Sequence, residues 1–179
     1  MKANRLLVSV LASGAAVAAL SCGDSGPFGP RSRASMKAAP PGLLVDSLAR
    51  SAGLLWCSVL PSDSVTATIG PAGGTLQVGP HALSVPAGAL DAPVTITAVA
   101  PSDSVSHVRL QPEGLTFQRP ASLTLSYASC DLLGVPLPKR IVYTSDSLVT
   151  LEYVPSVDDA ASRTVTGRLR HFSDYAVAW

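Results

Sequence analysis

The sequence has 179 residues, enough for one domain of ordinary size, and its 15 prolines and 14 glycines interrupt it at short intervals. Its 13 basic and 12 acidic side chains give a formal net charge of +1, with no basic surface for a nucleic acid. The sequence therefore predicts a single small domain and no nucleic-acid partner.

Residues 1–21 have the pattern of a signal peptide. Lys2 and Arg5 precede an apolar run from Leu6 to Leu20 that is broken only by small residues. This run of about 15 residues is shorter than the roughly 20 that a membrane-spanning helix needs. We therefore predict export, and loss of the two cations with the signal peptide would change the formal net charge from +1 to −1.

The end of this segment, Ala19-Leu20-Ser21-Cys22, resembles the lipobox of bacterial lipoprotein precursors. The resemblance implies that Cys22 becomes the N-terminus and carries acyl chains such as palmitate, each buried methylene contributing about 0.8 kcal/mol to membrane binding. The protein would then be lipid-anchored in the cell envelope, at the outer membrane or the periplasmic face. The alternative is an ordinary secretory signal cleaved nearby, with Cys22 left as a spare thiol.

Two segments precede the predicted domain. Residues 22–42 are rich in Gly, Pro and Ser, a composition typical of a disordered tether. Residues 43–63 form an apolar lead-in segment, in which Leu44 and Leu48 have the spacing of one face of a short helix. The second half of the lead-in, from residue 54 to residue 60, is equally compatible with a strand.

Residues 64–179 consist of short apolar runs separated by Gly and Pro, a pattern that predicts an all-β fold, an antiparallel β-sandwich. Val94, Ile96 and Ala98 alternate with threonines, as expected for strands with one buried face. The runs span mostly five to eight residues, whereas an outer-membrane barrel needs strands of about 10 residues. The expected strands are SVTATIG, TLQVG, ALSVP, PVTITAVAP, HVRLQP, SLTLSYA, RIVYT, LVTLEYVP, RTVTGRLR and YAVAW.

Four motifs in this region resemble the ZU-five domain of ankyrins, netrin receptors and the zonula occludens scaffold protein. They are Gly73-Gly74-Thr75-Leu76, Val85-Pro86-Ala87-Gly88-Ala89-Leu90, Pro112-Glu113-Gly114-Leu115-Thr116-Phe117 with Pro120, and His171-Phe172-Ser173-Asp174-Tyr175. The resemblance implies an antiparallel sandwich used for protein contacts or as a structural module, without a cofactor. The glycines and prolines of these motifs are also the residues that turns require.

The last motif raises the possibility of self-cleavage. In some intracellular members of the family, His-Phe-Ser is an autoproteolytic site, which by resemblance makes Ser173 the nucleophile and His171 the base or strain-holding residue. The bond between Phe172 and Ser173 would then be cleaved. The structural alternative, which we favour, is that this motif ends one strand and begins the next, with Phe172 or Tyr175 in the core.

No other catalytic or metal-binding pattern is present. The sequence contains no HExxH, GxSxG or phosphate-binding GK[ST] motif. His81 and His107 are isolated beside strand starts, where we expect surface or hydrogen-bonded residues rather than metal ligands. Asp158 and Asp159 are adjacent and lack further ligands, so we interpret them as a solvated turn. We therefore expect no enzyme, metal or cofactor.

With Cys22 assigned to a lipid, Cys57 and Cys130 remain as an even pair in an exported chain. This count favours a disulfide over two free thiols. The bond would join the lead-in segment to the sandwich.

Together these features predict a non-catalytic protein-binding or structural role at the cell envelope, with the membrane and another protein or envelope component as partners. A carbohydrate-binding sandwich is a further alternative. Such sites depend on exposed aromatic residues, and only 5% of the residues are Phe, Trp or Tyr. Trp56 has apolar neighbours, and we expect it to pack in the core rather than to form a stacking platform for a ligand.

Overall fold

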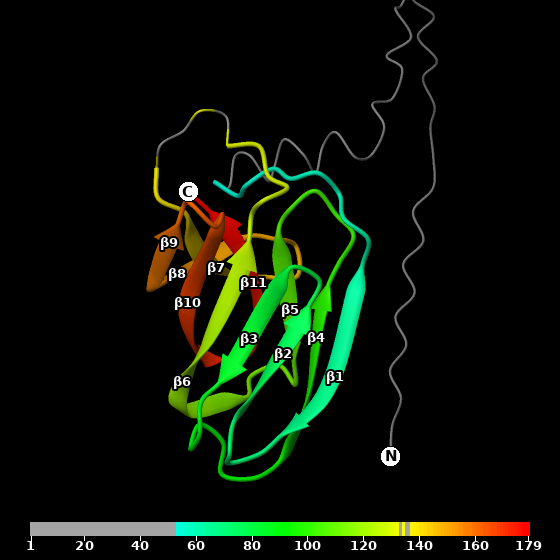
Figure 1. Ribbon diagram of the computed structural model, residues 1–179, viewed down its shortest axis with the longest axis vertical. Helices are drawn as coiled ribbons and strands as arrows, with labels where there is room; N and C mark the ends of the chain where they lie inside the picture. Colours follow the sequence, from blue (N-terminus) through cyan, green and yellow to red (C-terminus); the bar gives the residue numbers. More distant parts are fainter. Residues whose placement is uncertain (1–52, 133, 135–136) are drawn as a thin grey trace, which may run out of the picture. The chain divides into compact units, whose positions relative to one another are not determined.

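The computed structural model describes residues 53–132, 134 and 137–179, which form two antiparallel β-sheets packed as a sandwich (Figure 1). These residues contain no helix, and hence none that could cross a bilayer. The predicted antiparallel β-sandwich is confirmed. The signal peptide, Cys22, the tether and the proposed lead-in helix lie outside the described residues.

The larger sheet has six strands in the order β1-β4-β5-β11-β7-β8. Its strands are β1 (Asp63–Ile69), β4 (Val94–Ala100), β5 (His107–Gln111), β7 (Arg140–Thr144), β8 (Thr150–Val154) and β11 (Asp174–Ala178). Each lies where the sequence predicts a strand. β4 buries Ile96 and Ala98 against the second sheet and turns its threonines outward, as its alternation predicts.

The smaller sheet has five strands in the order β2-β3-β6-β10-β9. Its strands are β2 (Gly74–Val78), β3 (His81–Val85), β6 (Thr116–Ser126), β9 (Ser156–Asp159) and β10 (Thr164–His171). The prediction of a turn at Asp158 and Asp159 is wrong, because both residues belong to β9. This edge strand has little apolar alternation, and Val157, its one hydrophobic residue, is exposed.

β6 begins six residues earlier than the sequence predicts and passes through Pro120. Proline cannot donate a hydrogen bond to a neighbouring strand, so the middle of a central strand such as β6 tolerates it only at an irregularity. The pairing of β6 with β10 shifts register between Leu169 and His171, next to Ala121, the residue after this proline. The irregularity lets one long strand include a residue that would otherwise end it.

The two sheets approach closely where β8 is followed by β9. The chain leaves β8 in the larger sheet, passes through Pro155 and enters β9 in the smaller sheet. Gly167 of β10 faces this corner, and a Cβ atom there would lie 3.0 Å from Ile141 Cδ1 and 3.2 Å from Val154 Cγ1. A side chain at this position would therefore push the two sheets apart.

The second half of the lead-in segment packs on the sandwich in extended form. Leu54 is buried and bridges Ala178, and Leu55 N–H donates to Val177 O at 3.0 Å. These residues are thus extended, which agrees better with the predicted strand than with a helix, although they form only isolated bridges. Trp56 is half-buried and belongs to neither cluster of buried hydrophobic residues, so the prediction of a core tryptophan is wrong.

Cys57 and Cys130 form the predicted disulfide and are both buried. The bond closes a loop with a sequence separation of 73 residues. It joins the lead-in segment to the residues that follow β6, and Leu54 of the same segment bridges Ala178 at the end of β11.

Candidate functional site

The His171–Tyr175 motif forms the corner at which the chain passes from β10 in the smaller sheet to β11 in the larger one. Phe172 and Tyr175 are both buried, as the structural interpretation of the motif predicts. The Tyr175 hydroxyl donates to His171 O at 2.7 Å and so ties the two ends of the corner together. Burial, followed by the neighbouring Tyr143 and Glu152, raises the pKa of Tyr175 far above its usual value, so this hydroxyl stays protonated.

The third motif packs directly against this corner. Phe172 N–H donates to Leu115 O at 2.8 Å, and Gly114 N–H donates to Phe172 O at 3.0 Å. Phe172 also meets Phe117 edge to face, with ring centroids 5.0 Å apart. Two motifs that are distant in sequence thus form one unit, linked through backbone hydrogen bonds and a buried aromatic pair.

The proposed nucleophile and base are neighbours in this unit, but they are not hydrogen-bonded. Ser173 is buried, and its carbonyl accepts from Leu110 N–H at 3.1 Å. His171 Nδ1 lies 3.4 Å from both Phe172 O and the Tyr175 hydroxyl oxygen. Among the described residues the His171 ring therefore contacts the carbonyl that would be attacked, and makes no hydrogen bond with the Ser173 hydroxyl.

The first two motifs also meet in space. Gly73 has a φ of +76°, and a Cβ atom there would overlap Val85 O and lie 2.8 Å from Ala87 N. Gly88 N–H donates to Pro71 O at 2.8 Å across the same contact. Glycine at position 73 is required both by the left-handed backbone and by the closeness of the second motif.

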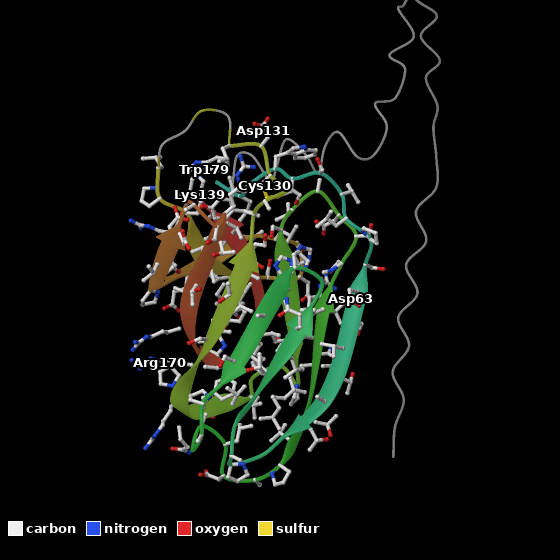
Figure 2. All side chains as sticks on the ribbon, viewed as in Figure 1. Asp63, Cys130, Asp131, Lys139, Arg170 and Trp179 are labelled. Atoms are coloured by element: carbon white, nitrogen blue, oxygen red, sulfur yellow. A yellow bond between two sulfur atoms is a disulfide. The ribbon has the colours of Figure 1, made fainter. Side chains whose placement is uncertain are left out.

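A cleft of about 450 Å³ lies beside the His171 corner. Tyr143, Glu152 and Tyr175 line it from the larger sheet, and Arg168 and Arg170 from the smaller one. Figure 2 shows Arg170 at the outer margin of the sandwich, beside β6 and β10. This cleft could not be predicted from the sequence, because its residues come from five strands that are brought together only by the sheet order.

His81 and His107 lie at one small cavity of about 30 Å³ and are both buried, so they are not surface residues. His81 Nδ1 accepts from Ser126 N–H at 3.1 Å, and burial, aided by His107, lowers the His81 pKa to about 4. His107 Nδ1 lies 3.3 Å from Asp103 Oδ2. In the described part of the chain no three His, Cys, Asp or Glu residues are grouped so that they could hold a metal ion.

The two adjacent aspartates point to different partners. Asp158 accepts from the Tyr127 hydroxyl at 2.6 Å and from Lys139 N–H at 2.8 Å, which joins β9 to two segments of the core. Asp159 accepts from the Ser162 hydroxyl at 2.7 Å, and this bond lowers its pKa. Both carboxylates are thus engaged within the fold. The role of Asp158 could not be predicted from the sequence, because its partner is a buried tyrosine 31 residues away.

No family model matches the chain, and a search of curated proteins finds no similar sequence.

Proposed function

We propose that the chain is an exported, lipid-anchored sandwich of the ZU-five type, with a non-catalytic protein-binding or structural role at the cell envelope. The pairwise packing of the four motifs is the observation that carries this proposal. Gly73 packs against the second motif, and the third motif is hydrogen-bonded to Phe172 in the fourth. The residues of these motifs resemble a set that recurs in ZU-five domains, and in this chain they make contacts that hold the fold together. Such contacts favour a scaffold over a reaction centre.

Export is supported by the disulfide. Bonds of this kind persist in oxidising compartments and are rare in the cytosol, and the Cys57–Cys130 bond closes a long loop at the edge of the domain. Lipid attachment at Cys22 rests on the lipobox resemblance alone. The partners we propose are the membrane, through that lipid, and another protein or envelope component, through the folded domain.

The anchor is tested by growing cells on an alkyne analogue of palmitate and comparing the wild-type protein with Cys22→Ser. We expect label and membrane association in the wild type, and no label in the variant. Cys57→Ser with Cys130→Ser is the matched control, because it removes the other two cysteines and should keep the label. Equal labelling of wild type and Cys22→Ser would refute the lipid anchor.

Self-cleavage at the corner is the second candidate, and one contact favours it. The Gly114 N–H that donates to Phe172 O would stabilise negative charge on that oxygen if the Ser173 hydroxyl attacked the carbonyl carbon. The new C–O bond would replace the C–N bond between the two residues, the amide nitrogen would take up the proton, and water would hydrolyse the ester. The missing hydrogen bond between His171 and the Ser173 hydroxyl argues against this reaction.

Intact mass under denaturing conditions separates the two candidates. We expect one species in wild type and in Ser173→Ala, differing only by the substitution. Detection of a species that lacks residues 173–179 in the wild type, but not in Ser173→Ala, would refute the inert binding module and support an autoproteolytic domain.

A further inference from the structure

The strand β10 is longer than the neighbour that covers its outer edge. β9 pairs with β10 only from Thr164 to Gly167, and the last hydrogen bond between these segments is from Arg168 N–H to Pro155 O at 3.2 Å. Beyond this point the remaining residues of β10 have β6 on one side and, among the described residues, no strand on the other. A free strand edge with unpaired backbone groups is a template for the addition of another strand.

This free edge borders the 450 Å³ cleft, and a second edge strand, β8, stands on the other side of it. In the described part of the chain β8 pairs only with β7, and it contributes Glu152 and Val154 to the cleft wall. The cleft is therefore bounded by two strand edges. An extended chain in the cleft could follow β10 along the line that β9 leaves at Pro155.

The cleft carries positive charge on the β10 side. Arg168 and Arg170 are both exposed, and within the described residues neither guanidinium has a carboxylate partner. Acidic side chains outnumber basic ones in the same part of the chain, so these two cations stand out from their surroundings. Glu152 lies on the opposite wall. Its carboxylate would accept hydrogen bonds from donors of an occupant on the side that faces β8.

Aromatic side chains line the inner part of the cleft. The Tyr143 ring meets His171 edge to face with centroids 5.2 Å apart, and it lies 6.1 Å from the Tyr175 ring. Tyr143 and His171 are half-buried, so part of each ring stays accessible. These rings offer a surface for one apolar or aromatic side chain of an occupant.

We propose that this cleft binds an extended acidic peptide segment of a partner protein, which pairs with the free edge of β10 and places alternate carboxylates against Arg168 and Arg170. This inference names the partner class and the surface for the binding role proposed above, and it rests on that role. The two arginines are two residues apart on one strand, so their side chains repeat with the period of an added strand. A second copy of this chain fits poorly, because symmetric pairing of two β10 edges would bring four arginines together.

The test uses the whole protein and a fluorescein-labelled peptide, acetyl-YEVEVE-amide, in a fluorescence anisotropy titration at low salt. The comparison peptide replaces each Glu with Lys. We expect saturable binding of the Glu peptide and at least about ten-fold weaker binding of the Lys peptide. Binding of both peptides with equal affinity, or of neither, would overturn the proposal.

Two variants locate the site. Arg170→Glu should weaken binding of the Glu peptide by about ten-fold and improve binding of the Lys peptide. Arg163→Glu changes the charge by the same amount just before the start of β10 and should leave both affinities within about two-fold, because that end of the strand is covered by β9. Equal effects of the two variants would show a general charge effect and refute the site.

A third measurement tests the strand pairing itself. N-methylation of alternate residues in the Glu peptide removes backbone donors and keeps every charge, so we expect its binding to be lost. Unchanged affinity of the methylated peptide would refute strand addition and indicate simple anion binding. Equally strong competition by an acidic oligosaccharide such as oligogalacturonate would lead to the same conclusion. The palmitate-labelling result is independent of these titrations, so the anchor and the cleft can fail separately.

Discussion

The neutral state of His81 makes stability depend on pH. Its Nδ1 atom accepts a hydrogen bond from Ser126 N–H at 3.1 Å, so this nitrogen carries no proton in the fold. Protonation would break that bond and create a charge in a buried site beside His107. Both effects favour the neutral ring, and the His81 pKa is lowered to about 4 from an ordinary value of 6.5.

The size of the effect follows from this difference. The unfolded chain takes up a proton at His81 as the pH falls below 6.5, whereas the folded chain does so only near pH 4. Stability from this residue is therefore fully present above pH 6.5 and is lost as the pH falls toward 4. With about 1.4 kcal/mol for each pKa unit, the free energy of unfolding should fall by about 2 kcal/mol between pH 7.5 and pH 5, and by about 3 kcal/mol in total.

Urea denaturation of the wild type and His81→Asn at pH 7.5 and pH 5 measures this contribution. The Asn side-chain oxygen can still accept from Ser126 N–H, but it does not titrate. Other titrating groups are common to both proteins, so the wild type should lose about 2 kcal/mol more than His81→Asn over this interval. Parallel losses in the two proteins would refute the argument that His81 is held neutral by burial.

Three further predictions concern contacts that hold the sandwich together, each read from the free energy of unfolding in urea. Gly167→Ala should destabilise the fold by about 1–3 kcal/mol through overpacking. Gly70→Ala should change stability little, because the nearest atoms that a Cβ there would meet belong to Pro93 and lie 3.6 Å or more away. Equal effects of the two substitutions would contradict the close approach of the sheets. Reduction of the Cys57–Cys130 bond should cost about 4 kcal/mol for a loop of this length, and an unchanged midpoint under reductant would show that the bond does not constrain the unfolded chain. Tyr127→Phe should cost about 1.5–3 kcal/mol by removing the hydroxyl donor to a carboxylate, and a neutral substitution would mean that solvent replaces this bond.

The strands could be predicted from the sequence because most of them alternate apolar and polar residues and end at Gly or Pro. β4 and the second half of β6 show this pattern most clearly, and both bury their apolar side as predicted. β9 was missed because its pairing with β10, and not its own side chains, makes it a strand. An edge strand of four residues with an exposed Val157 carries no pattern that distinguishes it from a turn.

The sites were harder to predict than the strands because they depend on which strands become neighbours. His81 and His107 are 26 positions apart and start strands of different sheets, and nothing in their local sequence indicates that they share a cavity. The disulfide was predictable for a different reason: a count of cysteines leaves one pair. The cleft required the full sheet order, since it combines residues from both sheets.

The features that build the corner of the sandwich also create the cleft. Pro155 carries the chain from one sheet to the other, and β9 therefore covers only the first half of β10. On the other side of β10, the irregularity that accommodates Pro120 keeps β6 paired with the second half as far as His171. The second half of β10 is thus paired along one edge, while no described strand covers its other edge, next to the exposed arginines. A strand fixed in this way is already in the conformation that an added peptide would need, so binding would require little ordering of the protein.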